Sequence, residues 1–294
     1  MALHVTNGDS TVPELRATGL APHILPWRDA LHEGPVPEQD LRRARAHFLG
    51  IEEEELAGRD RTLDELDEFV LWFEADLYDQ LQLIEILARL HARRVPADRI
   101  ALVCIGEFPG IAHFGGLGEL TAAQLSTLPR LPLTDAALEH ATRAWAAFRA
   151  PEPTGLAAIA THHHPELRFL AEAFDRLGRE YPSTRDGLSL SERRLLAAVA
   201  AGARTRGDAF LRAAAREPRP FMGDTWAFDR LDRLAAGPHP LLDGLELTDL
   251  GRDVLEGRAD HVALNGIDRW IGGVHLTADR WRFDEGTETV TRRA

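Results

Sequence analysis

The stretch EFVLWFEADLYDQLQLIEIL, residues 68–87, changes from the pattern of a buried strand to that of a helix. Its first part is a continuous apolar run, typical of a strand covered on both faces, and its second part places apolar residues at helical spacing. Three acids, Glu74, Asp76 and Asp79, occupy the junction. Carboxylates at such a junction indicate that the end of the strand carries a polar site.

Working outward, the first ~120 residues alternate short apolar runs with amphipathic stretches, which predicts strands separated by helices. The strands are expected to end near Thr6, Leu25 and Phe73, and a fourth lies in RIALVCIGEFPG. The acidic run EEEE at 52–55 is expected on a solvated surface. The predicted fold class is α/β, with a parallel or mixed sheet and flanking helices.

The pattern changes further along the chain and predicts three parts. Residues 1–125 are expected to form an α/β ligand-binding domain, and 126–181 a helical linker segment with a break at APEPTG. Residues 182–294 read as three helices followed by a small aromatic β-ribbon. That order is typical of a winged helix, so we expect a mostly α, winged-helix-like domain.

Composition places the chain among ordinary globular proteins. Of its 294 residues, 44% are hydrophobic, and no apolar run approaches the ~20 residues that span a bilayer. The first ten residues lack the pattern of a secretory signal, so we expect a cytoplasmic protein with no membrane partner. The single cysteine, Cys104, excludes an intrachain disulfide and any multi-cysteine metal site, and a buried apolar role is expected for it.

The chain contains no lysine, and its 34 basic residues are all arginine. This excludes a Walker loop, a pyridoxal phosphate enzyme and a Schiff-base aldolase, since each needs a lysine. Any bound phosphate must meet arginine, backbone amides or a metal. The net charge of −13 is concentrated in residues 1–181, with 17 Arg against 29 Asp plus Glu, whereas 182–294 carry 17 against 18. Nucleic acid could therefore bind only through a local arginine patch in the C-terminal part.

Ligands of open α/β sheets bind outside the carboxyl ends of the strands. Three loops of this chain are expected at that edge, and together they define a predicted acidic cleft. The candidate ligand-binding residues are Asn7, Gly8, Asp9, Ser10, Trp27, Arg28, Asp29, Glu74 and Gln80, with His32, Glu33, Asp76 and Asp79 beside them.

The residue types suggest roles in the binding of a phosphorylated or nucleotide-like ligand. Arg28 and the amides after Gly8 are expected to take an anion, and His32 titrates near neutrality and can act as general acid or base. Carboxylates without a lysine partner repel one another, which either raises a pKa or recruits a divalent cation, and Mg²⁺ is the candidate cofactor. The acids that would hold the cation or ligand hydroxyls are Asp9, Asp29, Asp76 and Asp79. Among them, Asp9 and Asp76 are the candidate metal ligands. The candidate catalytic residues are His32, Asp76 and Asp79.

Structural roles for the same motifs stay open. In NGDS, Gly8 can supply a turn while Asp9 or Ser10 caps the next helix. Arg28 and Asp29 can pair with each other, and either Asp76 or Asp79 can cap the helix that follows. The triple histidine at 162–164 is interpreted as a loop or helix start before Pro165, because consecutive side chains point in different directions and a zinc site needs convergent ligands.

Three separated motifs, LHVTNGDS, LPWRDALHEGPVP and LWFEADLYDQLQL, occur in an order that resembles a bacterial family described as domain of unknown function 1835. The resemblance covers roughly residues 1–125, and motifs such as FMGDTWAF resemble the C-terminal half usual in that family. It implies an architecture and a shared set of polar positions, and no reaction. The matching positions are Asn7, Gly8, Asp9, Ser10, Trp27, Arg28, Asp29, Gly34, Pro35, Trp72, Asp76, Asp79 and Gln80.

Two functions follow as hypotheses. The favoured one is a bacterial protein that binds a small phosphorylated or nucleotide-like ligand in the acidic cleft, with metal-assisted hydrolysis or group transfer as the reaction. The alternative is a ligand-sensing transcriptional regulator that binds DNA through the winged helix, which can also serve self-association into a homo-oligomer. Its candidate phosphate contacts are Arg230, Arg233, Arg269, Arg280 and Arg282.

Overall fold

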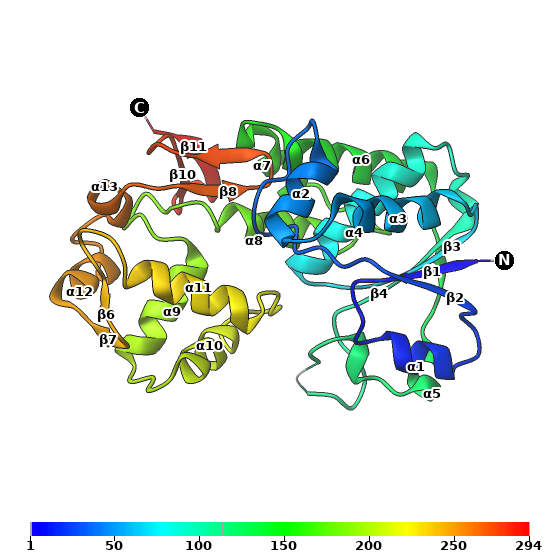
Figure 1. Cartoon of the computed structure of the whole chain (residues 1–294), viewed down its shortest axis with the longest axis horizontal. Helices are drawn as coiled ribbons and strands as arrows, with labels where there is room; N and C mark the ends of the chain where they lie inside the picture. Colours follow the sequence, from blue (N-terminus) through cyan, green and yellow to red (C-terminus); the bar gives the residue numbers. More distant parts are fainter. Residues whose placement is uncertain (1, 113, 294) are drawn as a thin grey trace. The chain divides into compact units, whose positions relative to one another are not determined.

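A computed structural model describes residues 2–112 and 114–293 of the chain (Figure 1). The chain divides into two compact units. Unit 1 consists of Met1–Ala173 with Gly272–Val274, and unit 2 of Phe174–Ile271 with His275–Ala294. Most of the expected linker 126–181 belongs to unit 1, because its longest helix packs along a helix of the α/β layer.

Unit 1 is built on a five-stranded mixed sheet with the order β2-β1-β3-β4-β5, which confirms the predicted α/β class. Four strands are parallel and the fifth, at the edge, is antiparallel. The strands are β1 Leu3–Thr6, β2 His23–Pro26, β3 Phe69–Glu74, β4 Ile100–Ile105 and β5 Leu131–Pro132. The carboxyl ends of the four parallel strands therefore meet at one edge of the sheet.

Strand β3 lies at the centre of the sheet, and all six of its residues are buried. Alternate side chains of a strand face opposite sides, so a strand covered on both faces must be apolar throughout. Its one polar side-chain atom in the middle, Trp72 Nε1, donates a hydrogen bond to His4 Nδ1 of β1 (3.0 Å). The apolar half of the opening stretch is therefore a core strand, as the sequence predicts.

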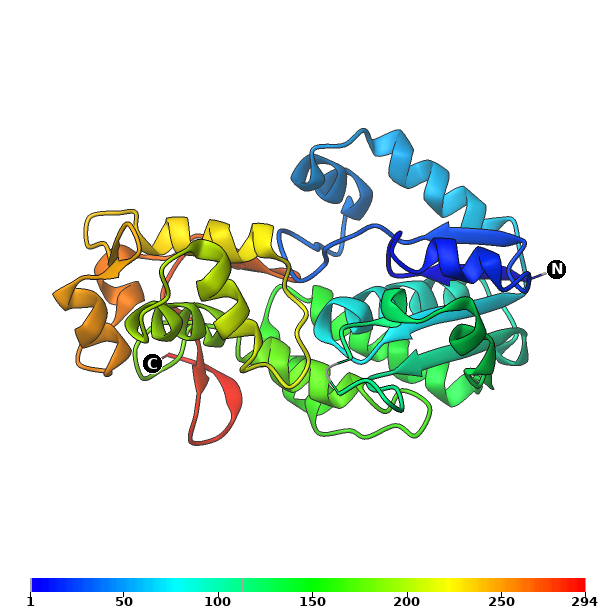
Figure 2. The same ribbon diagram turned by 90° about the horizontal axis from the view of Figure 1, so that it is seen from below.

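Helices cover both faces of this sheet (Figures 1 and 2). In Figure 1, α1 and α5 lie below the strands, whereas α4 and α6 lie above and pack along each other. The acidic run 52–55 caps and begins α3, where negative charge favours a helix start. The helices of unit 1 are α1 Val12–Ala17, α2 Leu41–Leu49, α3 Glu53–Asp64, α4 Leu77–Ala92, α5 Ala122–Thr127, α6 Asp135–Arg149 and α7 Leu156–Ala160, with short 3₁₀ turns at Ala97–Arg99, Leu117–Glu119 and Pro153–Gly155.

Unit 2 is mainly helical and begins within α8. The expected serine cap is confirmed: Ser189 accepts a hydrogen bond from the Glu192 amide, and the Glu192 side chain accepts one from the Ser189 amide. The elements are α8 Leu170–Gly178, α9 Leu190–Ala200, α10 Arg206–Ala214, α11 Asp224–Leu234, β6 Leu242–Asp243, β7 Glu246–Leu247, α12 Asp249–Leu255, α13 His261–Asn265, β8 Arg269–Ile271, β9 Val274–Leu276, β10 Trp281–Asp284 and β11 Thr289–Arg292.

A buried carboxylate anchors the packing of unit 2. Glu180 accepts hydrogen bonds from Arg176, Arg230, Arg269 and Ser191, at 2.5 to 2.9 Å. Burial works against its charge, but the three guanidiniums outweigh it and hold the pKa of Glu180 well below its usual range. Within the described part of the chain, no helix has the length and apolar character needed to cross a membrane.

Candidate functional site

Three carboxyl groups converge where β3 leads into α4. Glu74 is the last residue of β3, Asp76 caps α4, and Asp79 lies in the first turn of that helix. One ligand atom from each lies within 4.8 Å of the others, and we call these three residues the acidic cluster. The cap is direct, because Asp76 Oδ1 accepts a hydrogen bond from the Asp79 amide (3.1 Å). One of the open structural roles, a helix cap, is thus filled by Asp76.

Asp79 is 1% exposed and accepts hydrogen bonds from two donors, one just after β1 and one at the end of β3. Asn7 Nδ2 donates to Asp79 Oδ2 (2.8 Å), and the Glu74 amide donates to Oδ1 (2.7 Å). Burial, followed by the charges of Asp76 and Glu74, raises the pKa of Asp79 well above its usual value despite these bonds. The fold thus holds the Asp79 carboxyl group at a position where its ionised form is unfavourable.

Glu74 turns toward the loop after β4. Its Oε1 accepts a hydrogen bond from the Leu117 amide (2.7 Å), and its side chain is about nine-tenths buried. Gly116 makes this approach possible: its φ is +144°, and a Cβ there would lie 2.5 Å from Glu74 Oε2. Burial and the neighbouring charge of Asp76 raise the pKa of Glu74 to about 8.

The backbone around the acidic cluster is fixed by neighbouring polar groups. Gln80 Nε2 donates to the Glu74 carbonyl (2.7 Å), and the Cys104 thiol donates to the same oxygen (3.4 Å). Burial raises the pKa of the Cys104 thiol, so it stays protonated. Asn7 Oδ1 is buried and accepts no hydrogen bond from any residue that the structure describes. The carboxyl ends of β1, β3 and β4 therefore supply one polar environment.

Glu74 and Asp79 have no arginine partner in the part of the chain that the structure describes. Among residues 2–112 and 114–293, no ion pair includes Glu74 or Asp79. Other buried acids of the chain have such partners; Asp29, for example, lies 2.5 Å from Arg45. Two buried carboxyls without a cationic partner are costly unless a proton or a metal ion compensates them.

Asp9 and Arg28 form a separate pair at the ends of β1 and β2. Arg28 Nε and Nη2 donate to the two oxygens of Asp9, both at 2.7 Å. Both side chains are exposed, by 67% for Arg28 and 62% for Asp9. The hydrogen bonds from Arg28 lower the pKa of Asp9. The pair of Arg28 with Asp29, which the sequence left open, does not form, and Asp9 is not one of the three converging acids.

Trp27 and Asp29 point into the protein. Trp27 Nε1 donates to Glu85 Oε2 (2.8 Å), and the Arg59 guanidinium lies 3.6 Å from the Trp27 ring centroid. Asp29 accepts hydrogen bonds from Arg45, which is 1% exposed. These two candidate ligand residues thus hold the loop after β2 against α2, α3 and α4, and they form no hydrogen bond with the acidic cluster.

His32 lies near the site through Tyr78. Its ring is 5% exposed and packs edge-on to the Tyr78 ring, with centroids 5.7 Å apart. The Tyr78 hydroxyl donates to the Asn7 carbonyl (3.4 Å), and burial raises the pKa of Tyr78 to about 12.

Among the remaining candidates, Gly8 is half-buried and Ser10 is exposed. Ser10 packs against the loop that carries Gly118, because a Cβ added to Gly118 would lie 2.8 Å from Ser10 Cβ.

The loop after β4 was missing from the predicted site. Its residues 115–118, in the run FGGLGEL, bring the Leu117 amide to Glu74 and pack against Ser10. The sequence shows glycines there without the spacing of a dinucleotide-binding motif. These glycines allow the backbone to come close to the Glu74 carboxylate, because glycine has no Cβ.

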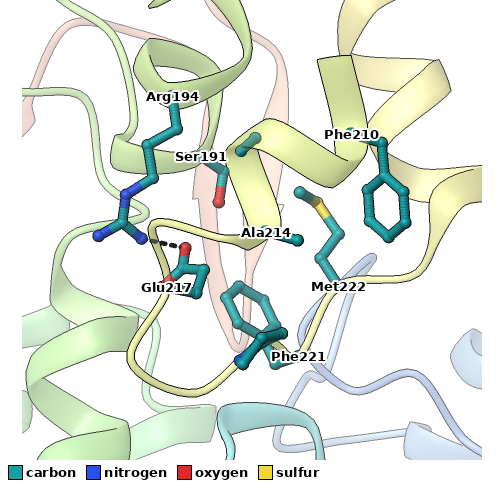
Figure 3. Close-up of a pocket in the computed structure, with 9 residues that line it drawn as sticks. Ser191, Arg194, Phe210, Ala214, Glu217, Phe221 and Met222 are labelled. Carbon is teal, nitrogen blue, oxygen red and sulfur yellow. Dashed lines mark ion pairs between the residues drawn. The ribbon is translucent and has the colours of Figure 1, made fainter. Parts of the chain in front are cut away.

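A pocket lies in unit 2 (Figure 3). It has about 300 Å³ of empty space, part of which is open solvent, and it is lined mainly by apolar side chains, including Phe210, Phe221 and Met222. Arg194 and Glu217 form an ion pair at its wall, as the dashed line in Figure 3 marks. The pocket contains none of the residues predicted from the sequence, and it lacks a convergent polar set.

Comparison with known proteins adds no family to these observations. Neither the scan against protein-family models nor the search of curated proteins returned a match to this chain.

Proposed function

We propose that the acidic cluster binds a divalent cation and, with it, a small phosphorylated or nucleotide-like ligand at the carboxyl edge of the sheet. The observation that carries this proposal is the convergence of three carboxyls within 4.8 Å, two of them buried and without an arginine partner among the described residues. A cation would allow all three to ionise and would lower the pKa values that burial raises.

The donor atoms favour a hard cation. Mg²⁺ and Ca²⁺ prefer carboxylate and carbonyl oxygens, whereas sites for Zn²⁺ usually contain histidine or cysteine. The Asn7 amide oxygen adds a neutral donor beside the three carboxyls, because its partner atom Nδ2 is already bonded to Asp79. Asp76 is the most accessible of the acids and would be the first contact for an entering ion.

Two arginines that follow strands of the sheet are candidates for the anionic part of the ligand. Arg28 follows β2, is exposed, and would exchange its pair with Asp9 for the anion. Arg168 Nη2 donates to the Cys104 carbonyl near the end of β4 (3.1 Å). A phosphate that bridges the cation and a guanidinium would satisfy both kinds of charge. Since the chain has no lysine, arginine is the basic side chain available for this contact.

Metal-assisted hydrolysis or group transfer is the reaction that we propose for this site. A bound cation would polarise the phosphoryl oxygens of the ligand. His32, adjacent to Tyr78, is the candidate for proton transfer. A His32→Gln variant should then keep cation affinity while losing turnover of a phosphorylated substrate, since Gln can form hydrogen bonds but cannot titrate.

The binding proposal is tested by titrating Mg²⁺, Ca²⁺ and Mn²⁺ into the full chain by calorimetry, alone and with adenosine triphosphate. Asp76→Asn should lower cation affinity by about tenfold or more, because it removes the accessible charge and keeps the shape. Asp98→Asn is the matched control: Asp98 is exposed in the turn before β4, at the opposite edge of the sheet. Equal affinities in both variants would contradict the proposal.

We also propose a winged-helix-like architecture for residues 182–294. The order of elements supports it, because three helices, α9 to α11, precede a short hairpin of β6 and β7. Four of the five arginines named for DNA contact form ion pairs within the chain: Arg230 and Arg269 with Glu180, Arg233 with Asp229, and Arg282 with Asp260. The fifth, Arg280, lies over the Trp281 ring. Guanidiniums used in this way add little to phosphate binding, so we do not propose DNA binding as a second function.

A further inference from the structure

A cavity of unit 2, separate from the pocket that Phe210 and Phe221 line, lies among α9, α11, α13 and the segment that precedes β8. Its volume is about 270 Å³, and it is partly open to solvent. An engineered cavity of about 150 Å³ binds benzene, so this cavity has room for a somewhat larger molecule. Its lining residues all fall between Pro182 and Arg269, within unit 2. The cavity shares no residue with the acidic cluster, so it is an independent candidate site.

Both signs of charge line this cavity. Two arginines, Arg233 and Arg269, and two acids, Glu192 and Asp268, are part of its wall. The formal charges of these four side chains cancel, so the wall does not favour an anion or a cation over a molecule that carries both signs. Electrostatic complementarity between a site and its ligand therefore indicates a ligand with one positive and one negative group.

Glu192 supplies a carboxylate that is only partly used by the fold. Its Oε2 accepts a hydrogen bond from the Ser189 amide (2.7 Å) as part of the cap of α9. Its other oxygen, Oε1, accepts no hydrogen bond from the residues that the structure describes. Burial works against the charge of Glu192, but Arg269 and His261 outweigh it and lower the pKa. Glu192 is therefore ionised at pH 7 and can accept a hydrogen bond from a ligand ammonium.

His261 supplies a donor whose position in the ring is fixed by Asn265. The Asn265 side chain is oriented by the backbone of His239, because its Oδ1 accepts from the His239 amide (3.1 Å) and its Nδ2 donates to the His239 carbonyl (3.0 Å). The same Nδ2 donates to His261 Nδ1 (3.2 Å). A neutral imidazole that accepts at Nδ1 holds its proton on Nε2, so His261 Nε2 is left as a donor at the cavity.

Arg233 is the guanidinium of this wall that a ligand can reach. Its side chain is 57% exposed, and its ion-pair partner is Asp229, one turn earlier in α11 (2.9 Å). Exposed pairs of this kind are weak, so a ligand carboxylate can take the place of Asp229. Arg269, in contrast, is held by Glu180, since its Nη1 donates to the Glu180 carbonyl (3.1 Å) and its Nη2 to Oε2 (2.6 Å).

The uncharged part of the wall is aliphatic and includes Ala236, Val262 and Ile267. No Phe, Tyr or Trp is among the described residues that line the cavity, so a nucleobase would find no ring to stack on. We propose that unit 2 binds an α-amino acid with an apolar side chain in this cavity. Glu192 accepts from the ammonium group of the amino acid, Arg233 and His261 donate to its carboxylate, and the aliphatic wall covers its side chain.

Calorimetric titration of the full chain with L-leucine and L-valine tests the site. Leucinamide, which lacks the carboxylate, and N-acetyl-L-leucine, which lacks the ammonium group, should bind about tenfold or more weakly than leucine, because each loses a charged hydrogen-bond partner. Glu192→Gln keeps an acceptor for the helix cap, and Arg233→Gln changes an exposed position, so both variants should fold. Each should weaken the binding of leucine by about tenfold or more. Arg206→Gln is the matched control, because it breaks another exposed pair of unit 2, with Asp232, outside the lining of the cavity.

The result that the proposed site requires is binding of leucine or valine that is retained in Arg206→Gln and Asp76→Asn and weakened in Glu192→Gln and Arg233→Gln. No binding of either amino acid at millimolar concentration would overturn the proposal. Leucinamide that binds as tightly as leucine would show that no carboxylate is recognised and would overturn it too. Binding that survives Glu192→Gln but is lost in Asp76→Asn would place the amino acid at the acidic cluster, which also contradicts the proposed site.

Discussion

Asn7 and Asp79, 72 positions apart in the chain, are joined by a hydrogen bond of 2.8 Å from the amide nitrogen of one to the carboxylate of the other. The bond crosses from the end of β1 to the first turn of α4. It shows that the carboxyl ends of two parallel strands supply side chains to one site. It also leaves the Asn7 amide oxygen available beside three carboxyls.

The first prediction concerns this bond. Asn7→Ala removes a donor from a buried carboxylate, which costs about 1–3 kcal/mol in the free energy of unfolding. Urea denaturation at pH 8 measures the change. Ser10→Ala, an exposed position in the same loop, should stay within about 0.5 kcal/mol of the unaltered chain. Similar values for both variants would contradict a structural role for the bond.

The second prediction is the pH dependence of stability. Burial and Asp76 raise the pKa of Glu74 from 4.5 to about 8, so between these values the folded protein holds a proton that the unfolded chain has lost. Stability should therefore fall as pH rises from about 5 to about 8 and then level off. Glu74→Gln should flatten this fall by on the order of 3 kcal/mol in urea denaturation. An unchanged slope in Glu74→Gln would contradict the raised pKa.

The third prediction separates a steric contact from backbone strain. Gly116→Ala places a Cβ against the Glu74 carboxylate and should destabilise the protein by about 2–4 kcal/mol and weaken cation binding. Gly110 also has positive φ, but a Cβ there meets no atom within 4 Å. Gly110→Ala should cost only about 1 kcal/mol and leave cation binding intact. Equal effects on binding would show that Gly116 does not position Glu74.

The fourth prediction tests the buried charges behind the loop after β2. Arg59 contacts Asp60, Glu85 and the Trp27 ring. Asp60 keeps Arg42 and Arg89 as partners, but Arg59→Ala removes the ion-pair partner of the buried Glu85 and should cost about 3–5 kcal/mol. Glu85→Gln keeps an acceptor for Trp27 and should cost about 1 kcal/mol or less. Arg61→Ala, which breaks an exposed pair with Glu54, is the control and should change stability by under about 1 kcal/mol. Thermal or urea unfolding ranks the three variants, and a different order would contradict this account.

Sequence patterns predicted the parts of the fold that depend on local periodicity. The apolar run before Glu74 is a buried central strand. The following helix begins at Leu77, directly after Asp76, which is one of the two residues that the sequence offers as its cap. The parallel direction of β1, β2, β3 and β4 follows from the alternation with helices. The antiparallel edge strand β5 has only two residues, too few to give a pattern.

The side-chain partners of the candidate residues could not be predicted, because they come from distant positions. Trp27 faces inward because its indole nitrogen bonds to Glu85, 58 residues later in the chain. Asp29 forms an ion pair with Arg45, which belongs to helix α2, where the sequence shows only an arginine-rich stretch. Neither partner follows from periodicity, since both depend on how helices pack on the sheet.

The measurement that tests the central claim most directly is the proton balance of cation binding. Mg²⁺ or Mn²⁺ is titrated at pH 7 in two buffers with different enthalpies of ionisation, and the difference in heat gives the number of protons released. Because Glu74 and Asp79 have raised pKa values, binding at the acidic cluster should release about one proton or more, and Asp76→Asn should weaken it. Binding without proton release, or no binding at millimolar cation, would contradict the account.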